Sequence, residues 1–423
     1  MKDGDSDAYY GKRAIKLSKK YGGKITLEAN LKVKSLSDFS TVYTPGVAAV
    51  SNAIKMHKDA SYDLTWRWNT IFIVTNGSRV LGLGDIGPLA SLPVMEGKSL
   101  LYKTLGGVNA VPIPIDSTSP EDFVKVVKSI SVTSGGIHLE DLASPFCFDV
   151  LEKLQKELKV PVWHDDQQGT AAATLAGLIN SFKIVGKDLK DSRLVLVGSG
   201  AANIALFNML GDYGVDLGKV VLIDSKGVLS RKREDLEQMK TENIWKHDVL
   251  LRSNASDFTK IEDAFCGADA VIAFSRPGPG IIGANWIRSM GTKPIVFANS
   301  NPTPEIFPDA AKRAGAYIVG TGRSDFPNQI NNSLIFPALF RGVLDSRAKR
   351  ITDRTAIVAA EALAEFARKK GISKNYIVPK MTERALYPAV AASVADYCCS
   401  SGDSSLKEGF GYFYKKAKKI LVN

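Results

Sequence analysis

The sequence is poor in cysteine and contains no long apolar run. Four cysteines at irregular spacing among 423 residues exclude a disulfide framework and form no zinc-ligand pattern, so we expect reduced thiols. Nothing approaches the roughly 18 consecutive apolar residues of a membrane span, and the polar N-terminal segment lacks the apolar core of a secretory signal. We therefore expect no membrane association and a cytoplasmic location.

The overall composition is typical of a globular protein. Hydrophobic residues make up 45% and charged residues 23%, which excludes global disorder, collagen-like and coiled-coil classes. The net charge of +11 permits attraction to phosphates, but the basic residues are spread along the chain and no nucleic-acid-binding motif occurs. We predict no nucleic-acid partner, and we interpret short clusters such as Lys232-Arg233 as solvated faces.

Short apolar runs alternate with helical patterns along the chain, which is typical of parallel sheets. An Ala-rich helix from Thr170 to Ile184 separates two such series, so we place a domain boundary between residues 160 and 170. The segment 354–399 is predicted to be helical. The predicted strands are 70–75, 108–115, 136–140 and 160–163 in the first series, and 193–197, 219–223, 268–273 and 294–298 in the second.

The second series opens with a glycine-rich turn. Gly198, Ser199 and Gly200 follow an apolar strand and begin a predicted helix, the context that holds a dinucleotide pyrophosphate on backbone N–H groups. Asp224 ends the next strand, at a distance suited to an adenine-ribose hydroxyl. Asn203 stands where a third Gly or Ala is usual, so the packing of this helix on its strand is poorly specified by the pattern.

A second glycine run, at positions 82, 84 and 87, follows a turn and has no strand-ending acid after it, so it is the weaker dinucleotide candidate. The choice of dinucleotide stays open at this point. Asp224 favours NAD, because a carboxylate repels a 2′-phosphate, whereas Lys226 and the run Arg231–Arg233 favour NADP.

Two acidic pairs, at 140–141 and 165–166, each follow a predicted strand, and parallel strands bring their carboxyl ends to one sheet edge. Converging carboxylates repel one another unless a hard cation such as Mg²⁺ or Mn²⁺ neutralises them, with helix caps and surface acids as the alternative interpretation. We expect the nearby His138 and His164 to be buried imidazoles bonded to backbone groups, outside any metal shell.

Seven segments together resemble malic enzymes of the short prokaryotic type, and they occur in one order along residues 40–345. The resemblance implies an α/β fold, with an N-terminal α/β malic-enzyme domain over 1–163 and a Rossmann-type, doubly wound dinucleotide-binding domain with C-terminal helices over 164–423. The matching segments are Tyr43-Thr-Pro-Gly-Val-Ala48, Asn76–Gly87, Glu96-Gly-Lys98, Leu139-Glu-Asp141, His164-Asp-Asp-Gln-Gln-Gly-Thr-Ala171, Asn301-Pro-Thr-Pro-Glu-Ile306 and Thr321–Asn332.

The resemblance implies oxidation of L-malate at C2 with reduction of NAD(P)⁺, loss of CO₂, and protonation to pyruvate, with Mg²⁺ or Mn²⁺ as Lewis acid. It implies that Lys98 takes the C2 hydroxyl proton, that Tyr43 protonates C3, and that Asp165 supports Lys98. The implied metal ligands are Glu140, Asp141 and Asp166. The implied substrate contacts are Arg79, Lys98, Asn301 and Asn332, and the implied cofactor contacts are Asn76, Gly77, Gly198, Ser199, Gly200, Ala201, Ala202, Asp224 and Asn301.

Asp224 and the Ser-Lys-Gly that follows it resemble the corresponding run of NADP-using short malic enzymes, so we favour NADP⁺ with some use of NAD⁺. The resemblance also implies a homodimer. Three other functions stay open on the sequence alone. They are malolactic conversion with retained NAD⁺, a metal-independent 2-hydroxy-acid or amino-acid dehydrogenase, and a non-catalytic dinucleotide-binding module. The joint presence of Tyr43, Lys98 and the acids argues against the last.

Overall fold

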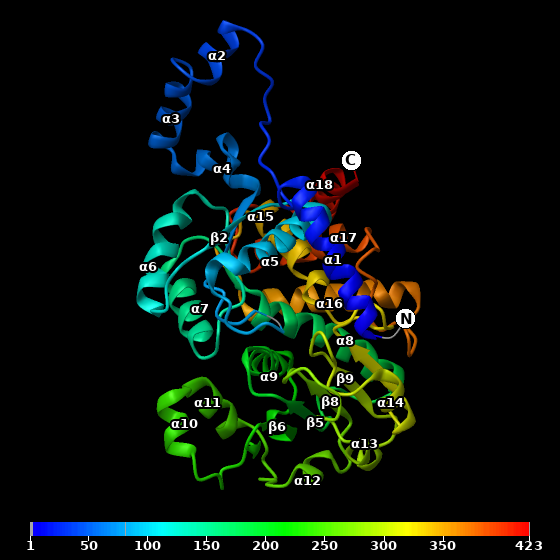
Figure 1. The fold of residues 1–423 in the computed structure, drawn as a ribbon. Helices are drawn as coiled ribbons and strands as arrows, with labels where there is room; N and C mark the ends of the chain where they lie inside the picture. Colours follow the sequence, from blue (N-terminus) through cyan, green and yellow to red (C-terminus); the bar gives the residue numbers. More distant parts are fainter. Residues whose placement is uncertain (1–2, 81, 423) are drawn as a thin grey trace.

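The computed structural model describes residues 3–80 and 82–422, so Leu81, in the second glycine segment, lies outside the described residues. Two sheet-containing parts are stacked one above the other, and a helical arm projects from one end (Figure 1). The helices are α1 (Asp3–Tyr21), α2 (Leu36–Val42), α3 (Val47–Met56), α4 (Ser61–Leu64), α5 (Gly87–Leu101), α6 (Pro120–Ile130), α7 (Phe146–Glu157), α8 (Thr170–Val185), α9 (Ala201–Tyr213), α10 (Leu236–Glu242), α11 (Ile244–Arg252), α12 (Ile261–Phe265), α13 (Ala284–Ser289), α14 (Pro308–Arg313), α15 (Phe336–Asp345), α16 (Asp353–Lys370), α17 (Leu386–Ser400) and α18 (Phe410–Val422).

The first sheet has four parallel strands in the order β2-β1-β3-β4. The central strand β1 is buried along its whole length, as its continuous apolar run predicts for a parallel sheet covered on both faces. Helix α5 packs on β1 and β2, and α7 packs on β4. The strands are β1 (Thr70–Thr75), β2 (Asn109–Pro114), β3 (Ile137–Leu139) and β4 (Val162–His164).

The second sheet has six strands in the order β10-β9-β8-β5-β6-β7, and all its pairs are parallel except β6 with β7. The order reverses direction at β5, whose neighbours β6 and β8 lead to opposite edges, so the sheet is doubly wound. The strands are β5 (Leu194–Val197), β6 (Val220–Asp224), β7 (Gly227–Val228), β8 (Ala270–Ala273), β9 (Ile295–Ala298) and β10 (Ile318–Thr321).

The C-terminal helices return to the first sheet-containing part. Helices α15 and α18 pack on η3 (Tyr102–Gly106), a π-helical turn that follows α5. A Cβ at Gly106 would lie 2.5 Å from the Pro337 carbonyl oxygen, so this approach requires glycine. The fully buried Arg341 of α15 bonds Asp345 and also Asn69, which directly precedes β1. The last helices therefore complete the packing of the first part.

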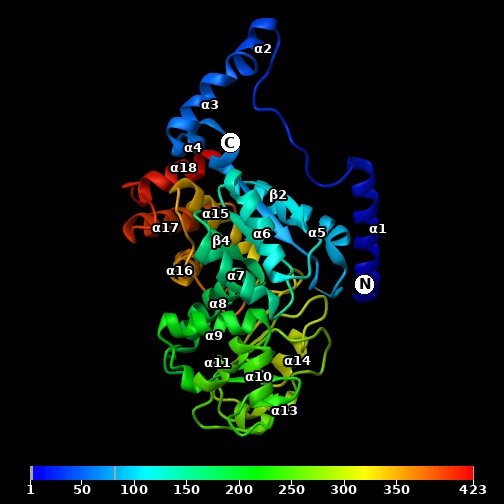
Figure 2. The same ribbon diagram turned by 90° about the vertical axis from the view of Figure 1, so that its left-hand side faces the viewer.

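The arm consists of α2, α3 and the loops around them, and both views show it extending away from the rest of the chain (Figures 1 and 2). Neither α2 nor α3 buries a residue, although both carry apolar side chains. Leu36 is 86% exposed and Tyr43 is 70% exposed. Isolated helices this short are marginal in water, so the arm lacks the packing that ordinarily stabilises a helix.

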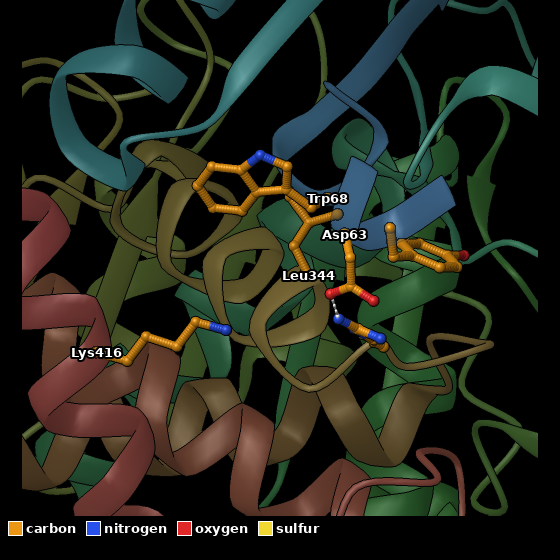
Figure 3. Close-up of a pocket in the computed structure, with 6 residues that line it drawn as sticks. Asp63, Trp68, Leu344 and Lys416 are labelled. Carbon is orange, nitrogen blue, oxygen red and sulfur yellow. Dashed lines mark hydrogen bonds and ion pairs between the residues drawn. The ribbon is translucent and has the colours of Figure 1, made fainter. Parts of the chain in front are cut away.

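The base of the arm is fastened to the body around a cavity of about 230 Å³. Figure 3 shows Asp63 and Trp68, at the base of the arm, facing Leu344 and Lys416 across this cavity. Asp63 forms an ion pair with Arg347, which follows α15. The base is thus fixed even though the arm beyond it makes few contacts.

These observations confirm the predicted α/β fold with two parallel-sheet units, one of them doubly wound. The exact domain boundary at 163/164 stays a prediction. Among residues 3–80 and 82–422, no helix combines the length and apolarity that crossing a bilayer requires.

Candidate active site

Acidic side chains gather at the carboxyl ends of β3 and β4, as the parallel arrangement predicts. Leu139 pairs with His164 at the ends of these strands. Glu140 follows the first of them, and Asp165 begins η5 (Asp165–Gly169), a π-helical turn, after the second. A Cβ at Gly169 would lie 2.0 Å from Asp165 Oδ1, so a larger residue there would displace the carboxylate.

Lys98, in the last turn of α5, points into this acidic cluster. Its Nζ lies 3.0 Å from Glu140 Oε1 and also donates to Asp165 Oδ2. Burial lowers the pKa of Lys98, but the charges of Asp165, Glu140 and Asp166 outweigh burial, so the net shift is upward. Lys98 is therefore charged in the chain by itself, and only further positive charge nearby would oppose that shift.

Asp141 and Asp166 lie together without a full set of partners. The Asp141 backbone N–H donates to Asp166 Oδ2 at 2.8 Å, while the buried Asp141 Oδ2 has no hydrogen-bond partner among the described residues. Burial and the charge of Glu140 raise the pKa of Asp141 to about 8, and the same two causes raise the pKa of Asp166 well above its ordinary value. Such crowding of carboxyl groups is relieved by a bound cation.

One oxygen from each of Glu140, Asp141 and Asp166 can lie within 4.8 Å of the others. An all-oxygen set of carboxylates suits Mg²⁺ or Mn²⁺. The Asp141 oxygen without a hydrogen-bond partner among the described residues is available as a metal ligand, so the residues fit the predicted metal. His138 and Asp165 form a second compact group with Glu140. That group fits less well, because its polar atoms are already hydrogen-bonded to one another, to Lys98 and to neighbouring side chains.

The two histidines differ from expectation. His138 bonds side chains and not a backbone group: its Nδ1 lies 2.7 Å from the Tyr102 hydroxyl and its Nε2 lies 2.6 Å from Glu140 Oε2. Neither buried ring nitrogen of His164 has a hydrogen-bond partner among the described residues, although Nδ1 lies 3.8 Å from Asp166 Oδ2, and burial lowers the pKa of this imidazole to about 3. The prediction of backbone partners was therefore wrong, because neighbouring side chains surround His138.

The predicted substrate-contact residues lie at different distances from the acids. A Cβ at Gly169 would lie 3.3 Å from Asn332 Cβ, so Asn332 borders the turn that carries Asp165. The Arg79 backbone N–H donates to the Asp141 carbonyl oxygen at 3.0 Å. Asn301 lies next to the second glycine run, because a Cβ at Gly82 would be 3.7 Å from the Asn301 carbonyl oxygen. The structure thus brings segments of both parts together here.

The predicted pyrophosphate turn lies between β5 and α9. Gly198 has a φ of +100°, and a Cβ there would lie 2.2 Å from the Phe274 carbonyl oxygen, so this position requires glycine. Gly200 is the N-cap of α9, and no side chain caps the helix before Ala201 and Ala202. Its N-terminal N–H groups therefore suit a phosphate. Ser199 lies between the two glycines.

Asn203 resolves the packing question at this turn. Its side-chain N–H groups donate to the carbonyl oxygens of Val197 and Gly198, at 3.0 and 2.8 Å. The amide ties the first turn of α9 to the end of β5, so a polar link replaces the close contact that a small residue would give.

Asp224, at the end of β6, is held by cations. Its Oδ2 accepts from Arg233 at 2.9 Å and also from Lys246, and its Oδ1 accepts from the Lys226 backbone at 2.8 Å. Burial raises the pKa of Asp224, but hydrogen bonding to Lys246 and Arg233 outweighs burial and lowers it overall. The side chain of Arg233 is only 10% exposed, so its interpretation as part of a solvated face was wrong.

One predicted residue, Tyr43, lies apart from these clusters. Tyr43 is the C-cap residue of α2, in the arm, and both views show α2 well separated from α5, the helix that carries Lys98 (Figures 1 and 2). Asn76 follows β1 at the sheet edge where the acids gather, and its side chain bonds Ser78 and the Ser117 carbonyl oxygen, which follows β2. Gly77 accompanies it, with the Gly87 carbonyl oxygen 2.2 Å from where a Cβ would be.

Sequence patterns did not reveal two further polar residues beside the second sheet. Glu305 is fully buried and accepts hydrogen bonds from Ser275 and Ser300, which ties the loops after β8 and β9 together. Asn299 follows β9, and neither atom of its buried amide has a partner in the described part of the chain. Its place at the carboxyl end of a parallel strand is the signal that could have identified it.

Comparison with known proteins matches both parts of the chain. The family model "Malic enzyme, N-terminal domain" matches residues 24–121, and "Malic enzyme, NAD binding domain" matches residues 167–399. The chain is 40% identical to a bifunctional malic/malolactic enzyme of Bacillus subtilis, covering 97% of this chain and 98% of the relative. It is 38% identical to an NADP-dependent malic enzyme of Halomonas elongata, covering 90% of this chain and 91% of that one.

A solved structure gives the same result. The crystal structure of the Entamoeba histolytica malic enzyme superposes with a TM-score of 0.94 at 43% identity, covering 99% of this chain and 87% of that chain. The likeness extends over both sheets and the C-terminal helices.

Proposed function

This chain belongs to the malic enzyme family, and we propose that its catalytic centre is the cluster of Lys98 and the acids that follow β3 and β4. The observation that carries the proposal is a lysine, only 12% exposed, that is bonded to Glu140 and Asp165. Beside it lie two further carboxyl groups, of which Asp141 has an oxygen without a hydrogen-bond partner among the described residues. The family reaction is oxidation of malate by a nicotinamide dinucleotide. Decarboxylation to pyruvate follows.

In this proposal Glu140, Asp141 and Asp166 hold the divalent cation, which when bound acts as a Lewis acid toward the substrate oxygen. Lys98 would take the proton of the C2 hydroxyl on Nζ in its neutral form, which the positive charge of the bound cation would favour, as hydride passes from C2 to the dinucleotide. When the bond from C3 to the carboxyl carbon breaks and CO₂ leaves, its electron pair forms the C2–C3 double bond of an enolate, and Lys98 returns its proton to the C2 oxygen to give the enol. Tyr43 then donates a proton to C3 as the enol hydroxyl gives up its own proton, which leaves the ketone of pyruvate and restores the Tyr43 proton. Asn332 and Arg79 border the same cluster and are suited to the substrate carboxylates.

Asp165 has a supporting part in this scheme. One oxygen accepts from Trp163 Nε1 at 3.0 Å and the other from Lys98, so the carboxylate is fixed from two sides. It therefore holds the ammonium in place between proton transfers. Since Asp165 is fully buried, solvent does not compete for this contact.

The first experiment follows absorbance at 340 nm with L-malate, Mn²⁺ and either NADP⁺ or NAD⁺, and assays pyruvate at the end. We expect reduced dinucleotide and pyruvate in equal amounts, with both lost in EDTA. Dinucleotide reduction without pyruvate would identify a malate dehydrogenase. Lactate without net reduction would identify malolactic conversion, and EDTA-resistant turnover would identify a metal-independent dehydrogenase.

For the dinucleotide we favour NADP⁺, because the acid that would repel a 2′-phosphate is already paired. Asp224 accepts from Arg233 and Lys246, and Asp235 accepts from Arg233 and Lys226. Three cations therefore face two carboxylates beside the strand end. This balance offsets the repulsion that an isolated acid would exert on a phosphate group.

Replacing Arg233 tests this preference. We expect Arg233→Ala to lower kcat/KM for NADP⁺ at least about tenfold, roughly 1.4 kcal/mol, with a smaller change for NAD⁺. Lys232→Ala is the matched control, because Lys232 is exposed and pairs with Asp257 instead. Equal losses with both dinucleotides, or a wild-type preference for NAD⁺ above about a hundredfold, would contradict the assignment.

We also propose a homodimer in which each arm reaches the partner's catalytic centre. The arm exposes a row of apolar side chains that a monomer leaves in water, and its base is anchored by Arg67, whose guanidinium donates to Ser134 and Ser61. Because Tyr43 lies on the arm, it would reach the catalytic centre of the other copy in such a dimer. The exposed arm residues are Leu27, Leu31, Leu36, Phe39, Val42, Tyr43, Val47, Val50 and Met56.

Mixing two inactive variants tests the shared centre. Lys98→Ala and Tyr43→Phe chains are each expected to be inactive alone. After unfolding and refolding as an equal mixture, half the dimers contain one chain of each kind, and one of their two centres has both groups intact. We expect about a quarter of wild-type activity. If each centre were instead built by a single chain, no activity would be recovered, because every chain in the mixture lacks one of the two groups.

A further inference from the structure

A buried row of hydrogen bonds leads from the aromatic core to the acidic cluster. The Tyr102 hydroxyl lies 2.7 Å from His138 Nδ1, His138 Nε2 lies 2.6 Å from Glu140 Oε2, and Glu140 Oε1 lies 3.0 Å from Lys98 Nζ. Tyr102 and His138 are fully buried, and Glu140 is almost so. The proposed function above uses Glu140 and Lys98 but gives the other two groups no part.

The direction of these hydrogen bonds follows from the partners available. Burial, together with the charges of Asp165 and Glu140, raises the pKa of Tyr102 well above its ordinary value, so the phenol keeps its proton. Within residues 3–80 and 82–422, the hydrogen-bond partner of the Tyr102 hydroxyl is His138 Nδ1, which therefore accepts that proton. The imidazole then carries its own hydrogen on Nε2 and donates to Glu140 Oε2. The opposite tautomer would set two lone pairs against each other and leave the phenol proton without an acceptor.

Aromatic rings hold this row in place. Phe336 of α15 lies 4.7 Å from the Tyr102 ring and 5.8 Å from the His138 ring, measured between centroids, and Lys98 Nζ lies 4.6 Å from the Phe336 centroid. Phe340 packs against the same two rings. Neither Tyr102 nor His138 has room to turn toward another partner, so the orientation of the imidazole is determined by the fold.

We propose that His138 is a positioning residue: oriented by Tyr102, it holds one carboxylate oxygen of Glu140 and leaves the other for Lys98 and the cation. This rests on the proposed function, in which Glu140 is a metal ligand. With one carboxylate oxygen held by the imidazole N–H, Glu140 would bind the cation through its other oxygen only. This would leave coordination positions for the substrate.

The test measures Mn²⁺ binding directly, without malate or dinucleotide, by titration of the free-Mn²⁺ paramagnetic resonance signal. We expect His138→Met, which keeps the volume but removes the donor, to weaken Mn²⁺ binding about 10- to 100-fold. His138→Gln restores an N–H donor at similar reach and is expected to recover most of this affinity. NADP⁺ binding, measured by calorimetry, serves as the control for folding and is expected to stay within about twofold.

Tyr102→Phe is the second variant, because it keeps the ring and removes only the hydroxyl that orients His138. We expect a loss of Mn²⁺ affinity of about three- to tenfold, the size of one hydrogen bond. Wild-type affinity in His138→Met overturns the inference while leaving the metal site intact. Equal losses in His138→Met and His138→Gln overturn it too, since packing alone would then explain them. A wild-type chain that binds no Mn²⁺ overturns the proposed function itself.

Discussion

Lys98→Ala is expected to lower kcat for malate oxidation by about 10² to 10⁴, the usual contribution of a proton-transfer group. Burial and two ion pairs already fix this ammonium, so its loss removes the group that takes the C2 hydroxyl proton without a substitute nearby. Mn²⁺ and NADP⁺ binding are expected to persist. The measurement is steady-state turnover together with binding of each ligand to the same protein.

The matched control is Lys103→Ala, one turn further along the chain. Lys103 is exposed and its ammonium donates to the Asn109 side chain, away from the acidic cluster, so wild-type turnover is expected. Removing Lys98 also leaves Asp165 and Glu140 without their cation, and the thermal midpoint is expected to fall. Normal turnover by Lys98→Ala would remove this lysine from the mechanism, whereas equal losses in both lysine variants would indicate a general defect.

Removing the metal, or one of its proposed ligands, is the second large effect. We expect EDTA or Asp141→Asn to lower the turnover rate by about 10² to 10⁴. The physical reason is the loss of several kcal/mol of transition-state stabilisation. Excess Mn²⁺ restores the chelated wild type but not the variant. Asp149→Asn is the control, because that acid pairs with Lys153 at the surface of α7. Turnover that persists in EDTA would refute the metal assignment.

The same substitution has an opposite effect on stability once the metal is removed. The pKa of Asp141 is raised from 3.8 to about 8 by burial and by Glu140, so the folded chain holds this proton more tightly than the unfolded chain. The contribution of this protonated carboxyl to the free energy of unfolding is therefore fully present below about pH 4 and is lost as the pH rises toward 8. Metal-free Asp141→Asn is expected to melt above the metal-free wild type at pH 8, with a smaller gap at pH 6.

Much of the fold and of the acidic cluster could be predicted because regular patterns encode them. The strand before Glu140 and the strand before Asp165 are short apolar runs with helices between them, and parallel pairing brings both ends to one edge. The glycine turn at 198–200 has its own signature. The family resemblance and the α/β class are confirmed by the comparisons and by the two sheets. The residue roles stay predictions, as do the cytoplasmic location and the absence of a nucleic-acid partner.

Contacts between distant segments could not be read from local patterns. The π-helical turn after α5 places Tyr102 beside His138, and sequence periodicity does not reveal such a turn. Arg233 returns to Asp224 through an irregular loop. The position of Tyr43 depends on an arm that finds no packing within its own chain. Strand β10 was not predicted, because four residues containing a glycine give a weak signal.

The return of the last helices to the first sheet has a consequence for synthesis of the chain on the ribosome. The core around η3 needs Pro337, Arg341 and Ile420, so the N-terminal part cannot finish packing when it first emerges. Translation from residue 163 to residue 423 takes about 13 to 52 s at roughly 5–20 residues per second. During that interval the apolar surface around Tyr102 is uncovered, so we expect chaperones to bind the nascent chain.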